Sequence, residues 1–236
     1  MKEFKQNMEI SDSELIDSFI ETNCFIRLAI IKRLRSGWQE SNEKKQFALA
    51  VAIIEQFMAL TEILVMLLYA MIEKGQVAEE SLFYHYLKVN ISEREDANSY
   101  STKNLRQKLS TRQTNSEFCD LWGLDIKKLD IEPKGDDMRK GTDILLDILD
   151  NYRCKIPLVQ AYNKIKHGML VRYKIIDSDI YIQNIIGMQS INDKVSNAEV
   201  TGFTANSTLL EKLEDNAKII SENIQALLAI IREGYL

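Results

Sequence analysis

The chain has 236 residues, of which 28% are charged and 45% hydrophobic, and its formal net charge is −5. This length can bury a sizeable core in one large domain or two small ones, and the two prolines and nine glycines are typical of an ordered, mostly helical protein. The acidic balance excludes a protein that binds nucleic acid or membranes through its overall charge, so any basic site must be a local patch.

Cysteine usage and the N-terminal residues favour a cytoplasmic protein. The three cysteines are widely spaced and form no Cys-x-x-Cys pair, which fits a reducing compartment and argues against a disulfide framework or zinc site. The first lysines are not followed by an apolar core, so no signal peptide is predicted. The most apolar stretch, residues 47–72, is interrupted by Glu55 and Glu62, and we predict a buried helix there rather than a membrane span.

Two long helices are predicted in the first third of the chain. Ser11 and Glu14 have the spacing of a capping box, and apolar residues then recur at helical spacing, which predicts a helix over residues 12–36. A second helix is predicted from about residue 41 to residue 75. Its apolar residues cover nearly the whole circumference, so we expect it to be the central, buried helix.

Glu55 and Glu62 lie on one line of this second helix, and buried carboxylates need partners. A di-iron site in a helical bundle would use Glu-x-x-His pairs, but neither histidine of the chain has a glutamate three positions before it. We therefore predict no metal site. The two glutamates are interpreted as partners of Arg or Lys side chains, or as a narrow solvent-facing stripe.

Shorter elements are predicted in the middle of the chain. Residues 78–90 form a predicted helix whose aromatic side chains either stack on a base or, more commonly, pack against the bundle. Residues 99–116 contain four cations and no acid, and Lys103 and Arg106 share one helix face. That face is either a patch that contacts phosphate groups or a solvated surface that balances acidic neighbours.

The last third of the chain changes from helical to strand patterning. Residues 136–153 and 157–168 are predicted helices. Two runs of β-branched and aromatic residues around a short polar turn then predict a β-hairpin over about residues 169–186. Residues 187–206 are predicted to be a polar, mobile connection.

A capping box at Thr208 and Glu211 begins the last predicted helix, which carries one clean apolar stripe up to Ile231. No repeat or linker divides the chain. The predicted fold is mainly α: a single domain over residues 1–236, built as a bundle of five or more helices with a β-hairpin insertion before the last helix.

The strongest functional signal lies at the end of the helix before the hairpin. Asn163, Lys164 and His167 fall on its polar side, and Asn163 is one turn before His167, within hydrogen-bonding reach. The chain has no phosphate-binding loop, dinucleotide-binding motif, nucleophile elbow or metalloprotease motif, and no cofactor is predicted. The other interpretation of His167 is a residue that stabilises the helix C-terminus beside a capping glycine, Gly168.

Basic residues gather around this histidine, with no acid before Asp177. A local excess of positive charge in an acidic chain indicates a site for an anionic ligand. The candidate residues for binding RNA or a partner protein are Lys164, Lys166, Arg172, Lys174, Lys103 and Arg106.

Residues 163–167, late in an all-helical bundle, resemble the motif region of HEPN domains. In active members of that family an Arg, commonly followed by Asn, precedes a His by a few residues; here Asn163 and His167 match, and Tyr162 stands in the position of the Arg. The resemblance implies a helical bundle that dimerises through the motif helices. It also implies either a metal-independent ribonuclease or a non-catalytic RNA-binding or scaffolding protein, in toxin–antitoxin, CRISPR-associated or abortive-infection systems.

Three functional hypotheses follow. The first is a HEPN-like cytoplasmic homodimer, not bound to membranes, that binds RNA or a partner protein in bacterial defence or a toxin–antitoxin system. The second is a metal-independent ribonuclease with His167 as general acid or base and Asn163 orienting it, in which Lys164 or Lys166 supplies the cation that Tyr162 cannot. The third is a structural subunit that assembles through its hairpin and last helix.

Overall fold

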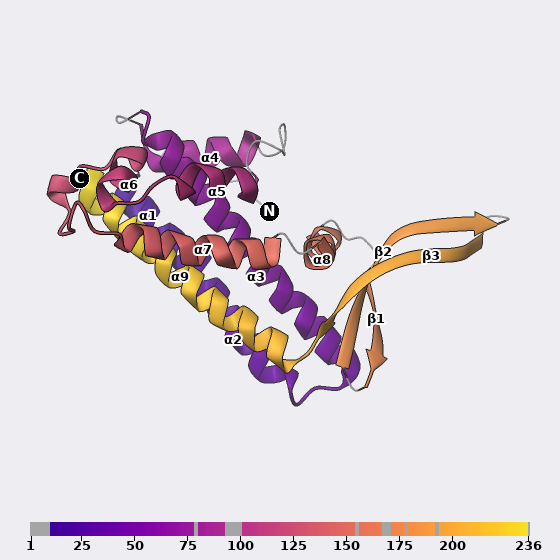
Figure 1. Cartoon of the computed structure of the whole chain (residues 1–236). Coiled ribbons are helices and arrows are strands. Elements are labelled where there is room, and N and C mark those ends of the chain that lie inside the picture. Colours follow the sequence, from indigo (N-terminus) through magenta and orange to yellow (C-terminus); the bar gives the residue numbers. More distant parts are fainter. Residues whose placement is uncertain are drawn as a thin grey trace, which may run out of the picture.

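A computed structural model describes residues 10–77, 80–92, 101–153, 156–166, 171–177, 179–191 and 194–235. The helices form a bundle, and an antiparallel sheet lies at one end of it, between α8 and α9 in the chain (Figure 1). The predicted mainly α class with a β insertion before the last helix is confirmed. The elements are α1 (Asp12–Ile20), the π-helix η1 (Glu21–Ile26), α2 (Arg27–Trp38), α3 (Glu43–Lys74), α4 (Leu82–Ser92), α5 (Thr102–Ser110), α6 (Asn115–Trp122), the 3₁₀-helix η2 (Ile126–Lys128), α7 (Asp137–Arg153), α8 (Ile156–Lys166), β1 (Val171–Ile176), β2 (Asp179–Ile191), β3 (Lys194–Ala205) and α9 (Ser207–Tyr235).

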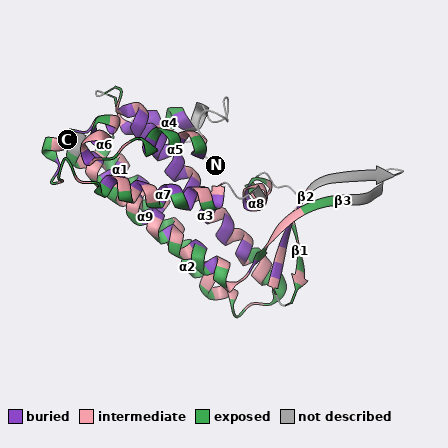
Figure 2. Ribbon diagram, viewed as in Figure 1, coloured by how far each residue is buried: buried purple, intermediate pink, exposed green. Residues whose placement is uncertain are grey.

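Helix α3 runs through the bundle and supplies much of its core (Figure 2). Every residue from Ile63 to Ile72 is at most 8% exposed. Among the described helices, α3 is the one long and apolar enough to cross a membrane, but 67% of its most apolar 18-residue window is buried inside the protein. Burial of that kind is typical of a core helix, and the prediction of a central buried helix is confirmed.

The first predicted helix contains a turn of π-helix, η1, between α1 and α2. A π turn holds more residues than an α turn and so changes which side chains face the core. Cys24 and Ile31 are buried, whereas Ile26 and Ile30, which follow the α-helical spacing of the sequence, are 48% and 38% exposed. The helix exists as predicted, but part of its predicted apolar stripe faces solvent.

One of the two predicted capping boxes is confirmed. The Ser11 hydroxyl accepts a hydrogen bond from the Glu14 backbone N–H at 3.3 Å, and the Glu14 carboxylate accepts one from the Ser11 N–H at 2.9 Å. Helix α9, in contrast, begins one residue before the predicted Thr208 cap. Asn206 caps it by accepting from the Leu209 N–H at 3.0 Å.

The insertion is larger than the predicted hairpin. β1 pairs with the first half of β2, and β2 pairs with β3 along most of its length, in the order β1-β2-β3. The prediction of a polar, mobile connection over residues 187–206 is wrong, because β3 occupies Lys194–Ala205. Residues 194–199 contain few apolar side chains, so the pattern of β3 resembles a loop, and its strand structure comes from pairing with β2.

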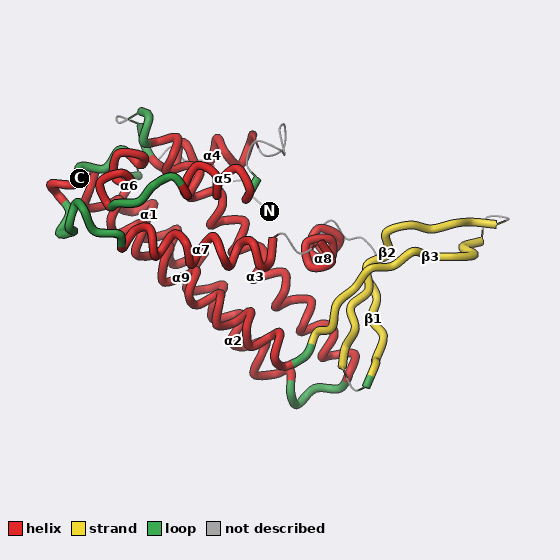
Figure 3. The backbone as a smooth tube through the Cα atoms, viewed as in Figure 1, coloured by secondary structure: helices red, strands yellow, loops and turns green. Residues whose placement is uncertain are grey.

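β2 and β3 continue beyond the end of β1 as a two-stranded ribbon that projects from the bundle (Figure 3). Their pairing extends to Ile191 opposite Lys194. The register shifts twice along the ribbon, between Ile185 and Gly187 and between Gln189 and Ser190. Such shifts are β-bulges, which bend and twist a strand pair locally.

The inner face of the sheet packs on α8 and α3. The Asn184 side chain donates to the Pro157 carbonyl oxygen at 2.7 Å, and the Thr201 hydroxyl lies 2.8 Å from Gln160 Oε1. On the same face, the ring of Tyr173 stacks on Phe47 of α3 with 4.6 Å between centroids. Helix α8 therefore lies between the bundle and the sheet.

A close backbone contact joins the C-terminal ends of α3 and α6. A Cβ atom added at Gly75 would lie 2.1 Å from the Leu121 carbonyl oxygen. Gly123 has φ +64°, and a Cβ atom there would lie 2.8 Å from the Gly75 Cα. Only glycine fits at both positions, since side chains rarely adopt this φ and no rotamer change can move a backbone atom away.

We expect Gly75→Ala to lower the free energy of unfolding by about 1–3 kcal/mol or more, because α6 must move away from α3. Gly37→Ala is the control, since Gly37 lies in α2 and its nearest neighbouring heavy atom, on Leu49, is 3.9 Å from the added Cβ. That change should raise the stability by about 0.5–1 kcal/mol through helix propensity. Urea denaturation of both variants checks the pair, and equal stabilities would contradict the contact.

Candidate functional site

Helix α8 is attached to α3 through one carboxylate. Tyr162 and Lys166 are one helical turn apart, so their side chains lie on the same side of α8. The Tyr162 hydroxyl donates to Glu62 at 2.6 Å, and Lys166 Nζ lies 3.0 and 3.2 Å from the two Glu62 oxygens. The Glu62 side chain is only 17% exposed. We call Glu62, Tyr162 and Lys166 the Glu62 cluster.

The electrostatics of the cluster favour an ionised Glu62. Burial would raise the pKa of Glu62, but hydrogen bonds from Tyr162 and Lys166 and the charges of Lys166 and Arg153 outweigh it, and the pKa lies below its ordinary value of 4.5. Burial, followed by the hydrogen bond to Glu62, raises the pKa of Tyr162, which is therefore a neutral donor at pH 7. The charges of Arg153 and Arg27 act on Tyr162 in the opposite direction, so both arginines lie near the cluster.

The interpretation of Glu62 as the partner of a basic side chain is confirmed. Glu55, two turns earlier on α3, is half-buried. Tyr162 is 4% exposed, in agreement with its predicted place on the apolar side of its helix, although its hydroxyl reaches a carboxylate. No group of three His, Cys, Asp or Glu side chains in the described ranges is arranged to hold a metal ion.

Asn163 and Lys164 of the predicted motif differ in how far the structure exposes them. Asn163 is exposed. Lys164 is half-buried and lies one turn after Gln160, whose side chain contacts Thr201 on β3. His167, the candidate proton-transfer group, lies outside the described residues, so its pairing with Asn163 stays a prediction.

The cations on β1 lie on the opposite face of the sheet from α8. Asn184 points toward α8, and its neighbour Gln183 on β2 points to the opposite face, because adjacent strand residues alternate between faces. Arg172 is paired with Gln183 and therefore shares that outer face. Arg172 and Lys174 are both exposed. The structure therefore does not bring these two cations together with Lys164 and Lys166 in one patch.

The predicted basic face of residues 99–116 is partly neutralised. Arg106 forms ion pairs with Asp147 at 2.9 Å and with Asp150 at 2.7 Å, both from α7. Lys103 is exposed on α5. Arg106 therefore balances acidic neighbours, as in the second of the two interpretations of this face.

Aromatic residues of α4 pack mainly within the protein. The rings of Phe83 and Tyr86 lie 5.5 and 5.2 Å from the ring of Phe19 on α1. His85 is 3% exposed and its Nε2 lies 2.8 Å from the Glu80 carboxylate. The packing interpretation of this helix therefore holds for Phe83 and Tyr86, while Tyr84 is 59% exposed.

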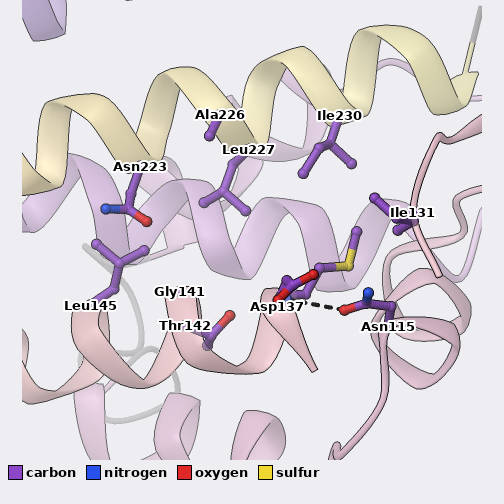
Figure 4. A pocket seen from close by; sticks show the side chains of 11 residues that line it. Asn115, Ile131, Asp137, Gly141, Thr142, Leu145, Asn223, Ala226, Leu227 and Ile230 are labelled. Carbon is purple, nitrogen blue, oxygen red and sulfur yellow. Dashed lines mark hydrogen bonds between the residues drawn. The ribbon is translucent and has the colours of Figure 1, made fainter. Parts of the chain in front are cut away.

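A cavity of about 170 Å³ between α7 and α9 is a second place where a ligand could be sought (Figure 4). Its lining is mostly apolar, and its two amides already have partners: Asn115 accepts from the Met138 N–H at 3.1 Å, and Asn223 donates to the Ile219 carbonyl at 2.8 Å. Both amides thus already bind the protein's own backbone, so neither points to a particular ligand.

Four residues that no sequence motif marks lie near the Glu62 cluster or on the outer face of the sheet. Arg27 and Arg153 lie near the Glu62 cluster but are distant from it in sequence, so no local motif marks them. Tyr181 of β2 is paired with Thr204 of β3, and Gly202 is paired with Gln183. The alternation of residues along the predicted hairpin could have placed Tyr181 on the same face as Arg172, because it lies two residues before Gln183.

We expect Glu62→Gln to lower the free energy of unfolding by about 1–3 kcal/mol at pH 7, because charge-assisted hydrogen bonds from Tyr162 and Lys166 are lost. The pKa of Glu62 is lowered by folding, so its contribution is complete above about pH 4.5 and is lost as the pH falls through the lower folded value. The difference between wild type and variant should therefore shrink below pH 4.5, as measured by urea denaturation from pH 3 to 7.

Glu55→Gln is the matched control, since Glu55 lies on the same line of α3 and outside the cluster. Its effect at pH 7 should stay within about 0.5 kcal/mol, as for other changes away from a specific contact. A Glu62 variant with the same pH profile as wild type would contradict the ionised cluster.

Comparison with known proteins adds no relative. Neither a protein-family model nor a curated protein nor a solved structure matches this chain. The likeness of residues 163–167 to the HEPN motif therefore stays a prediction.

Proposed function

We propose that this protein is a HEPN-like RNA-binding protein that contacts the RNA backbone through Arg172 and Lys174 on the outer face of β1. The observation that carries the proposal is the exposure of both side chains on one face of a strand. RNA is favoured over other polyanions by the resemblance of residues 163–167 to HEPN domains. The cytoplasmic location, the homodimer and the defence setting implied by that resemblance belong to the same proposal.

The charge distribution supports these two residues over the other candidates. The chain carries a net charge of −5, and two of the candidate cations form ion pairs: Lys166 with Glu62, and Arg106 with two aspartates of α7. Arg172 Nε donates to the neutral amide oxygen of Gln183 at 2.8 Å, which orients the guanidinium without neutralising it. Arg172 therefore keeps a full charge for a phosphate group, and exposed guanidinium groups match phosphate geometry well.

Binding is preferred to cleavage because of where Lys166 lies. Metal-independent cleavage of RNA needs a proton-transfer group and a cation for the charge that develops on the phosphate. Lys166 precedes His167 in the chain, but its ammonium group is held by Glu62. The cation closest in sequence to the candidate histidine is thus already used to attach α8 to α3.

The test is the binding of a fluorescein-labelled single-stranded RNA oligonucleotide, measured by anisotropy in EDTA from 25 to 200 mM salt. The double variant Arg172→Glu with Lys174→Glu should bind more weakly. The slope of log K against log [salt] should also fall by about 1.4, since each phosphate contact to a single strand releases about 0.7 counterion.

The matched control is Lys127→Glu with Lys128→Glu, which changes the net charge equally. Both lysines are exposed and belong to η2, which contacts α9 and lies toward the end of the bundle away from the sheet (Figure 1). This variant should bind as wild type does. Equal affinities for all three proteins would refute the proposal, and RNA cleavage in EDTA that is abolished by His167→Ala would replace it with ribonuclease activity.

A further inference from the structure

The outer face of the sheet carries an aromatic ring between its cations and its third strand. The antiparallel register places Lys174 opposite Tyr181 and Arg172 opposite Gln183. Residues directly opposite in such a pair point to the same face, and so do residues two apart on one strand. Tyr181 therefore shares the exposed face of Arg172 and Lys174.

The ring of Tyr181 lies across Gly202 of β3. A Cβ atom added at Gly202 would be 2.9 Å from Cζ and 3.1 Å from Cε1 of Tyr181. The same Cβ atom would lie 2.3 Å from the Ile182 carbonyl oxygen, so Gly202 lets the backbones of β2 and β3 approach closely beside the ring. The edge of the Tyr181 ring therefore contacts Gly202, and the ring lies against the neighbouring strand β3.

This ring is not part of the core. The aromatic residue of β1 on the inner face, Tyr173, stacks on Phe47, whereas Tyr181 pairs with no aromatic ring among the described residues. Tyr181 is half-exposed. Its ring is thus partly open to solvent and lies outside the hydrophobic core.

One acid, Asp179, shares this face at the turn, two residues before Tyr181. Asp179 is paired with Ile176 at the turn, and its carboxylate is 3.4 Å from the Asn206 amide nitrogen. Arg172 is at the other end of β1. An aromatic surface bordered by cations is the combination that binds single-stranded nucleic acid: the bases stack on the ring and the backbone follows the cations.

We propose that Tyr181 is a stacking surface for an unpaired base, and that the RNA recognised by the outer sheet face is single-stranded. This inference rests on the proposed RNA binding and adds the class of RNA to it. In a duplex the base faces are covered by their neighbours, so only unpaired nucleotides present a base to Tyr181. Arg172 and Lys174 then contact the phosphates of the same strand.

The test compares a 12-nucleotide oligouridine with a 12-base-pair RNA duplex by fluorescence anisotropy at fixed salt. Tyr181→Ala should weaken binding of the single strand by about 5- to 150-fold, the range measured for loss of one stacked base. Tyr181→Phe keeps the ring and should bind as wild type does. The duplex should bind more weakly than the single strand, and its affinity should not change in Tyr181→Ala.

Tyr181→Leu separates stacking from folding, because leucine still covers Gly202 but has no π system. It should weaken single-strand binding as Tyr181→Ala does, with a melting temperature close to that of wild type. If the leucine variant binds as wild type does, or if duplex and single strand bind equally well, the stacking role of Tyr181 is refuted, while the proposed RNA binding is not. The stacking surface is also overturned if RNA binding is lost in the Arg172→Glu and Lys174→Glu variant but unchanged in Tyr181→Ala and Tyr181→Leu. No RNA binding by the wild-type protein refutes the proposed function itself.

Discussion

The Glu62 cluster is the interaction on which the arrangement of bundle and sheet depends. Helix α8 contacts α3 and α7 on one side and all three strands on the other. Its side toward the sheet is attached through Gln160 and the Pro157 carbonyl, and its side toward α3 through Tyr162 and Lys166. A largely buried carboxylate is stable only when its oxygens are satisfied, so Glu62 helps to set the position of α8, which supports the sheet together with Phe47 of α3.

This use of charge explains why a short basic stretch does not make one basic surface. Lys166 neutralises Glu62, and Lys164 lies on the side of α8 near the sheet, whereas Arg172 and Lys174 lie on the outer sheet face. Four cations within eleven residues are thus divided between attachment of α8 and the surface of the sheet. In an acidic protein, the cations that remain exposed are more informative about a ligand than the cations that are close in sequence.

Local physics made most of the helices predictable. A helix that is apolar on all sides must be central, which identified α3, and the Ser11–Glu14 spacing located the start of α1. β3 was not predictable, because its strand structure depends on pairing with β2. The sequence predicted that Glu62 pairs with an Arg or a Lys, but not which one. The helical wheel of α8 places Lys166 beside Tyr162, and it does not show that Glu62 of α3 lies next to them.

The bulges of the β2–β3 ribbon bear on whether its edges can pair with a strand of another chain. A ribbon beyond the edge of a sheet presents backbone N–H and C=O groups on both sides, and such edges can template pairing with another chain. Each register shift interrupts the regular hydrogen-bonding pattern and increases the local twist, so a straight strand cannot follow the edge over its full length. The irregular backbone between Ile185 and Ser190 thus lets the ribbon project without offering a continuous template for aggregation.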